Sequence, residues 1–154
     1  MKYLPAAIFL FLHISSAIAT ELPGYDPLER VIPNVTSAFE AEIISVSIDT
    51  TASDRVLRLI VKPKEAIFGY MPTEDEFQCI YKEFLIPDIP PGMHLSFVNY
   101  TGSGIEFQAE VGESYIFLIG PDLETSENNL VLRMELPHTK EQIFMIYQQH
   151  EELI

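Results

Sequence analysis

The sequence predicts a mainly β protein, a small and mainly antiparallel barrel or sandwich with one C-terminal helix packed on it. Between residues 38 and 136, short apolar stretches with the period of a strand are separated by turns rich in Pro, Gly and polar residues. From residue 139 onward the apolar residues fall at helical spacing instead. Several strands followed by one helix favour a closed or doubled strand layer with the helix on one side.

The first twenty residues have the three parts of a secretory signal peptide. Lys2 supplies a positive charge, residues 6–12 (AAIFLFL) are an apolar core, and residues 17–19 (AIA) form a cleavage site of small residues. The apolar core is shorter than the about 20 residues that a membrane-spanning helix needs. We therefore expect an exported protein, secreted or periplasmic, with no membrane anchor and a mature start near Thr20 or Glu21.

The rest of the chain is long enough for one domain with its own hydrophobic core. Residues 21–33 (ELPGYDPLERVIP) are rich in Pro and aperiodic, which is typical of an extended segment. We therefore expect an extended leader over residues 21–37 and a single domain over residues 38–154.

The chain is strongly acidic, because 23 Asp and Glu against 9 Lys and Arg give a formal net charge of −14. Such a charge repels a phosphate backbone and argues against nucleic acid as a partner, whereas basic proteins, cationic peptides and divalent cations remain permitted. Cys79 is the only cysteine, so the domain forms no internal disulfide. Its apolar neighbours favour a buried strand residue, and a reactive thiol or an intermolecular disulfide are the alternatives.

The first two strands are expected at residues 38–49 and 55–62, joined by a polar turn at 50–54 (TTASD). In the first strand the two faces carry Phe39, Ala41 and Ile43 on one side and Ile44, Val46 and Ile48 on the other. The change of face near Ile43 and Ile44 predicts a β-bulge, because strand faces alternate with period two. The core face of the second strand consists of Leu57, Leu59 and Val61.

Further strands are predicted at 77–86, 95–100, 114–119 and 130–136. Residues 63–75 contain Pro63, Gly69 and Pro72, which predicts an excursion between strands. Residues 114–119 (SYIFLI) are nearly all apolar, so we expect a strand that is buried on both faces. One face should hold Tyr115, Phe117 and Ile119, and the other Ile116 and Leu118. A polar loop at 121–129 separates this strand from the last one.

The C-terminal segment is predicted to be an amphipathic helix from about Lys140. Thr139 and Gln142 have the spacing of a capping box, in which the two side chains satisfy backbone N–H groups at the helix start. The inward stripe is expected to contain Ile143, Ile146, Tyr147, His150 and Leu153.

Residues 111–119 (VGESYIFLI) resemble a recurrent element of the netrin-like, TIMP-like (NTR-like) OB-fold superfamily, in which a valine-glycine pair and a tyrosine lead into a central barrel strand. Residues 38–48 resemble the long first strand of that fold. Residues 56–61 and 64–69 resemble its second strand, although four residues separate Lys64 from Gly69. The resemblance spans about residues 38–147 and implies a small OB-like β-barrel.

The same resemblance carries no functional residue over to this chain. Metalloprotease inhibitors of the superfamily chelate the zinc of their target with an N-terminal cysteine, whereas the expected mature start here is Glu21-Leu22-Pro23. Inhibition by that mechanism is therefore not implied.

The favoured function is an exported non-enzymatic module that binds a protein or peptide partner through barrel loops. The candidate contact residues are the apolar members of the excursion, Ile67, Phe68, Tyr70 and Met71, whose spacing fits neither a strand nor a helix. The competing interpretation is that Phe68 and Tyr70 plug one end of the barrel. No cofactor is expected.

The alternative function is a small exported metal-dependent enzyme or divalent-cation-binding module, built on Cys79, a histidine and the acidic loops. Asp122, Glu124 and Glu127 lie in one loop and are the candidate oxygen ligands, although the loop lacks the residue order of a calcium loop. His94, His138 and His150 form no pair at metal-ligand spacing. A carrier with an apolar cavity is a third possibility, and Asn34 and Asn99 begin glycosylation sequons.

Overall fold

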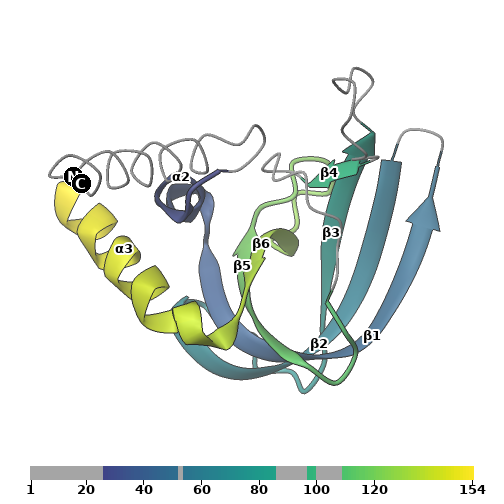
Figure 1. Ribbon diagram of the computed structural model, residues 1–154, viewed down its shortest axis with the longest axis horizontal. Coiled ribbons are helices and arrows are strands. Elements are labelled where there is room, and N and C mark those ends of the chain that lie inside the picture. The colour runs from purple at the N-terminus through teal and green to yellow at the C-terminus, as the bar shows by residue number, and fades with distance from the viewer. Residues whose placement is uncertain (1–25, 52–53, 86–96, 100–108) are drawn as a thin grey trace, which may run out of the picture.

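The computed structural model describes residues 26–51, 54–85, 97–99 and 109–154 (Figure 1). The elements are α2 (Leu28–Val31), η1 (Ile32–Asn34), β1 (Ser37–Thr50), β2 (Asp54–Gly69), β3 (Phe77–Leu85), β4 (Phe97–Asn99), β5 (Ser114–Gly120), β6 (Leu130–Glu135), η2 (Pro137–Thr139) and α3 (Lys140–Leu153). The expected signal peptide and His94 lie outside the described residues.

Five strands form a ring of hydrogen-bonded pairs in the order β1, β2, β3, β6, β5 and back to β1, and β4 pairs with β3 at one end. All pairs are antiparallel except β3 with β6, which meet in parallel at Ile80 and Leu130. The expected mainly β fold with a C-terminal helix is therefore confirmed, but the sheet is mixed. The helices α2 and α3 lie on the same side of the curved sheet (Figure 1).

The predicted bulge in the first strand is confirmed. Ile43 pairs with Val61 and Ser45 pairs with Ile60, so Ile44 is the extra residue. Before the bulge, Phe39, Ala41 and Ile43 face the core, and after it Val46 packs against the same core. The extra residue shifts the alternation by one, which keeps apolar side chains on the same face along the whole strand.

The second strand is longer than predicted, because residues 63–69 continue β2 instead of leaving the sheet. Pro63 pairs with Ala41 at a register shift, where the missing N–H of proline breaks no regular ladder. Gly69 ends the strand with φ of +71°, and a Cβ atom there would collide with the backbone carbonyl of Thr36. Only glycine fits this close approach.

The strand β5 separates two hydrophobic cores, as its apolar sequence predicted. Tyr115, Phe117 and Ile119 belong to the inner core, whereas Ile116 and Leu118 belong to the outer core. The inner core lies inside the ring and its buried residues are Phe39, Ala41, Ile43, Leu57, Leu59, Val61, Cys79, Tyr81, Phe117, Ile119 and Val131. The outer core is shared with the helices and its buried residues are Leu28, Val31, Ile32, Ala38, Phe68, Ile116, Leu118, Leu130, Leu132 and Ile143.

The expected extended leader differs from the structure over residues 28–34, which form α2 and η1. Leu28, Val31 and Ile32 are buried in the outer core, so this segment packs on the sheet. The buried Arg133 of β6 donates a hydrogen bond from Nη2 to the carbonyl of Asp26 at 2.5 Å, which ties the segment to the strand. Pro27 and Pro33 led to the prediction of an extended segment, but proline is also tolerated at the start of a short helical turn.

The C-terminal helix begins at Lys140 as predicted, but the capping box does not form. Residues 137–139 are a 3₁₀ turn, so Thr139 has helical backbone angles, and its hydroxyl donates to the Leu136 carbonyl at 2.7 Å. Ile143 is buried, and Ile146 and Tyr147 pack against the outer core. Leu153 is 87% exposed, so the apolar stripe ends earlier than expected.

Candidate binding groove

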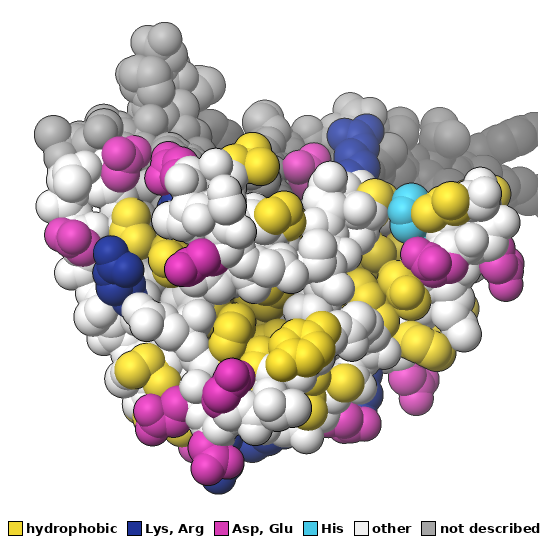
Figure 2. Space-filling view, turned by 180° about the vertical axis from the view of Figure 1, so that it is seen from behind, with side chains coloured by type: hydrophobic (Ala, Val, Ile, Leu, Met, Phe, Trp, Pro, Cys, Tyr) yellow, Lys and Arg dark blue, Asp and Glu magenta, His cyan; other side chains and the backbone are white. Residues whose placement is uncertain are grey.

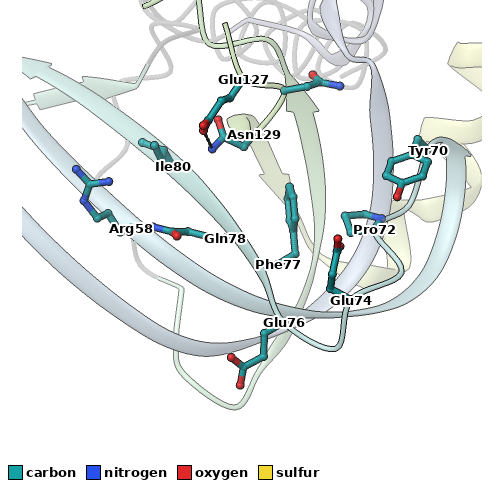
Figure 3. A pocket seen from close by; sticks show the side chains of 11 residues that line it. Arg58, Tyr70, Pro72, Glu74, Glu76, Phe77, Gln78, Ile80, Glu127 and Asn129 are labelled. Atoms are coloured by element: carbon teal, nitrogen blue, oxygen red, sulfur yellow. Dashed lines mark hydrogen bonds between the residues drawn. The ribbon is translucent and has the colours of Figure 1, made fainter. Parts of the chain in front are cut away.

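A groove lies beside the N-terminal part of β3, ahead of the point where β6 begins. The two strands pair only at Ile80 and Leu130 among the described residues, and the backbone N–H of Ile80 donates to the Asn129 carbonyl at 2.9 Å. N-terminal to this contact, β3 pairs with β2 at one edge, and no described strand pairs with its other edge. The groove has a volume of about 680 Å³ and is lined by Arg58, Tyr70, Pro72, Glu74, Glu76, Phe77, Gln78, Ile80, Glu127, Asn128 and Asn129 (Figure 3).

Two loops form the walls of this groove. Residues 70–76, which connect β2 to β3, contribute Tyr70, Pro72 and Glu74 on one side, and Glu127 and Asn129 from the loop before β6 lie opposite (Figure 3). The ring of Phe77 stands between the two walls, and the side chain of Glu76 points away from the other labelled residues (Figure 3). The lining therefore combines aromatic surface with carboxylate and amide groups.

The end of the second loop is held in place by hydrogen bonds. The Asn129 side chain donates from Nδ2 to Glu127 Oε2 at 2.9 Å. Because a carboxylate only accepts, this bond also fixes which atom of the amide is the oxygen. Asn129 Oδ1 is buried and accepts no hydrogen bond from the described residues. The neighbouring Asn128 Oδ1 accepts from the Thr36 hydroxyl at 2.6 Å, which anchors the loop to the start of β1.

An ion-pair cluster anchors the beginning of the same loop to β3. The Lys82 ammonium lies 3.0 Å from Asp122 Oδ1 and 2.9 Å from Glu124 Oε2. Burial lowers the pKa of Lys82, but its hydrogen bonds to Glu124 and Asp122 raise the pKa by more, so it lies above 10.5. Burial likewise raises the pKa of Asp122, and the hydrogen bond from Lys82 together with that from the Glu124 N–H brings it below 3.8.

Of the four predicted contact residues, three pack against the hydrophobic cores and one is exposed. Phe68 is 7% exposed and stacks on Tyr147 with ring centroids 4.0 Å apart. Ile67 packs partly buried against the outer core and Met71 against the inner core. Tyr70 is 68% exposed and lines the groove. The expectation of exposed apolar side chains therefore fails for Phe68, because β2 continues to Gly69 and carries it beneath α3.

The side chains of Asp122, Glu124 and Glu127, the candidate oxygen ligands of a divalent cation, do not converge on one point. The ammonium of Lys82 occupies the position between Asp122 and Glu124, and Glu127 is engaged by Asn129. Within the described ranges, no cluster of three or more His, Cys, Asp or Glu side chains has a geometry that would hold a metal ion. Lys82 thus forms ion pairs with Asp122 and Glu124 of the acidic loop. Asp122 is buried instead of solvated.

Cys79 is buried in the inner core, as its apolar neighbours predicted. Burial raises the pKa of its thiol to about 12. The thiol is therefore protonated at neutral pH, and the thiolate is the form that acts as a nucleophile or metal ligand.

Sequence reasoning missed Arg58, Phe77, Ile80 and Asn129 as groove residues. Phe77 and Ile80 read as ordinary strand residues, and they border a groove because β6 first meets β3 at Ile80 and does not extend alongside Phe77. The acidic character of residues 121–129 was visible in the sequence, but its neighbour across the groove, the segment 70–76, is far away in the chain.

A comparison of the chain with protein-family models and with curated protein sequences finds no match to either. Among the helices that the structure describes, none is long and apolar enough to cross a membrane.

Proposed function

We propose that the ring of strands is a small OB-like barrel of the kind that the resemblance to the netrin-like superfamily implies. The order β1, β2, β3, β6, β5 with one parallel contact between β3 and β6 supports this interpretation. An OB-fold is a five-stranded, partly open barrel that binds ligands on the face of its second and third strands and through the loops that follow its first and fourth strands. The groove residues from β2, from β3 and from the loop before β6 correspond to part of that surface, whereas residues 70–76 do not, and this partial correspondence supports the proposal.

The proposed function is that of an exported, non-enzymatic module that binds a protein or peptide partner in this groove. The observation that carries the proposal is the groove itself, in which Tyr70 is an exposed aromatic residue opposite the anchored loop before β6. Tyrosine is enriched at protein interfaces, because it combines a large apolar ring with a polar tip. Export rests on the signal-like residues 1–20.

Binding suits the groove better than catalysis. The Cys79 thiol is protonated inside the inner core, and Lys82 closes the acidic loop cluster. The net charge of −14 argues against nucleic acid, although many OB-folds bind it, because phosphates would be repelled.

A display experiment tests the proposal. The mature protein is immobilised and used to select binders from a phage-displayed library of random peptides. Selected peptides should lose at least about tenfold in affinity for Tyr70→Ala, as expected when an aromatic hot spot is truncated. They should bind Leu123→Ala unchanged, because Leu123 is 78% exposed and does not line the groove. A selection whose binders all ignore Tyr70→Ala would show that the groove is not the binding site.

A further inference from the structure

The groove has an excess of negative charge over positive charge. Glu74 and Glu127 contribute two carboxylates, whereas the Glu76 side chain points away, and Arg58 is the single basic side chain among the described lining residues (Figure 3). Lys82 is close in sequence to Ile80, but its ammonium is already neutralised by Asp122 and Glu124. Asp and Glu side chains are spread widely over the face of the molecule seen in Figure 2. The formal net charge of −14 has the same sign as the groove.

Two of the polar groups of the groove are the carboxylates of Glu74 and Glu127, which accept hydrogen bonds and do not donate them. A hydrogen bond from a charged donor to a carboxylate is stronger than one between neutral groups. The missing chemistry is therefore that of a ligand with several N–H groups and positive charge.

The aromatic side chains favour the same class of ligand. Tyr70 and Phe77 line the groove from opposite ends of the segment that connects β2 to β3. A guanidinium group stacks on aromatic faces while its N–H groups reach carboxylates or carbonyls in its own plane. Arginine thus uses both kinds of lining at once, whereas an acidic or purely apolar segment leaves the acceptors unpaired.

We propose that the groove binds an extended, arginine-bearing basic segment of a partner polypeptide. The inference rests on the proposed function and specifies the chemistry of the partner. The guanidinium stacks on the exposed ring of Tyr70 and donates to the carboxylates of Glu74 and Glu127. The adjoining peptide follows the edge of β3 that lies N-terminal to its contact with β6, and extended backbone suits a strand edge that lacks a described neighbour.

Three synthetic peptides test the charge requirement against the mature protein by fluorescence anisotropy. The first alternates arginine with glycine, the second replaces each arginine by citrulline, and the third replaces each arginine by glutamate. Citrulline keeps the shape and loses the charge. We expect the arginine peptide to bind at least about tenfold more tightly than the citrulline peptide and the glutamate peptide not to bind. Its affinity should fall as salt shortens the screening length from about 10 Å at 0.1 M to about 3 Å at 1 M.

Matched variants distinguish the effect of the groove carboxylates on affinity from the effect of the net charge of the protein. Glu74→Gln with Glu127→Gln should weaken binding of the arginine peptide about tenfold, since two exposed charged contacts are lost. The control, Glu141→Gln with Glu151→Gln, makes the same change of net charge at exposed positions of α3 and should leave binding unchanged. Arg58→Gln removes the single described cation of the lining and should tighten binding.

The outcomes distinguish the inference from the function on which it rests. Equal binding of the arginine and citrulline peptides, or equal weakening by the groove and α3 variants, would overturn the inference. Displayed peptides that depend on Tyr70 but contain no basic residues would also overturn it, and they would leave the proposed function standing. A library that yields no binder dependent on Tyr70 would overturn both.

Discussion

Phe117 lies in the centre of the inner core, fully buried on β5. Its ring stacks on Phe39 with centroids 6.3 Å apart, and Phe39 in turn meets Phe77 edge to face at 5.9 Å. Phe77 is also a groove residue, so this aromatic row connects the core to the groove floor. Packing in the core and the shape of the groove therefore depend on the same side chains.

Phe117→Ala should lower the free energy of unfolding by about 3 to 5 kcal/mol, because it removes a buried ring and leaves a cavity. Chemical denaturation measures the change. Phe144→Ala is the matched control, since Phe144 is exposed on α3 and its truncation should cost well under 1 kcal/mol, about the limit for surface changes. Equal unfolding midpoints for the parent and Phe117→Ala would contradict the burial of this ring.

Individual residues differ in how well the sequence predicted them. Cys79 and the alternating residues of β5 were placed correctly, because their apolar neighbours in sequence are also their neighbours in the sheet. Phe68 and Tyr70 look equivalent in the sequence, yet one is buried and the other is 68% exposed. The difference comes from Tyr147, which covers Phe68 from almost the other end of the chain.

At the scale of elements, local patterns predicted strands well and their ends poorly. The bulge at Ile44 was readable because the apolar face changes within one strand. The continuation of β2 through Pro63 was not, because the tolerance for that proline depends on the register of β1. To predict the groove, one would have to know where β6 begins to pair with β3, and no single segment of the sequence encodes that pairing.

The loop before β6 is an element whose shape depends on its ion-pair cluster. Asp122 is buried, receives Lys82 and the Glu124 N–H, and its own N–H donates to the Glu127 carbonyl at 2.7 Å. Ser126 closes the loop with a φ of 61°, which non-glycine residues adopt only under such local constraint. The cluster thus holds Glu127 in place at the groove.

Asp122→Asn should destabilise the protein at neutral pH by about 1 to 3 kcal/mol, since it leaves Lys82 with a weakened partner. The folded-state pKa of Asp122 is lower than its ordinary 3.8, so its charge contributes stability above that value. The contribution is lost as pH falls through the lower folded-state pKa. Unfolding midpoints of parent and variant should therefore converge in acid. Glu124→Gln is the control, because Glu124 is 80% exposed in this pair and its loss should cost less than about 1 kcal/mol.

On the scale of the whole molecule, two cores lie on opposite faces of one central strand. The inner core fills the ring, and the outer core depends on α2, η1 and α3 to cover the other face of β5. The groove lies beside β3, at the edge where β3 forms a single described residue pair with β6. Helices and groove therefore use different parts of the sheet, so that one part carries the outer core and another carries the proposed binding groove.

Truncation before Pro137 should abolish cooperative unfolding, because it exposes Phe68, Ile116 and Leu118 of the outer core. An isolated helix of this length is marginal in water, so α3 is held by Ile143, by the stacking of Tyr147 on Phe68 and by the ion pair of Lys140 with Glu65. The truncated protein should aggregate or melt without a sharp transition in calorimetry. Removal of Leu153 and Ile154, both 87% exposed, should leave the transition unchanged. A soluble monomer from the longer truncation that still unfolds cooperatively would mean that α3 is a detachable binding element and not part of the domain.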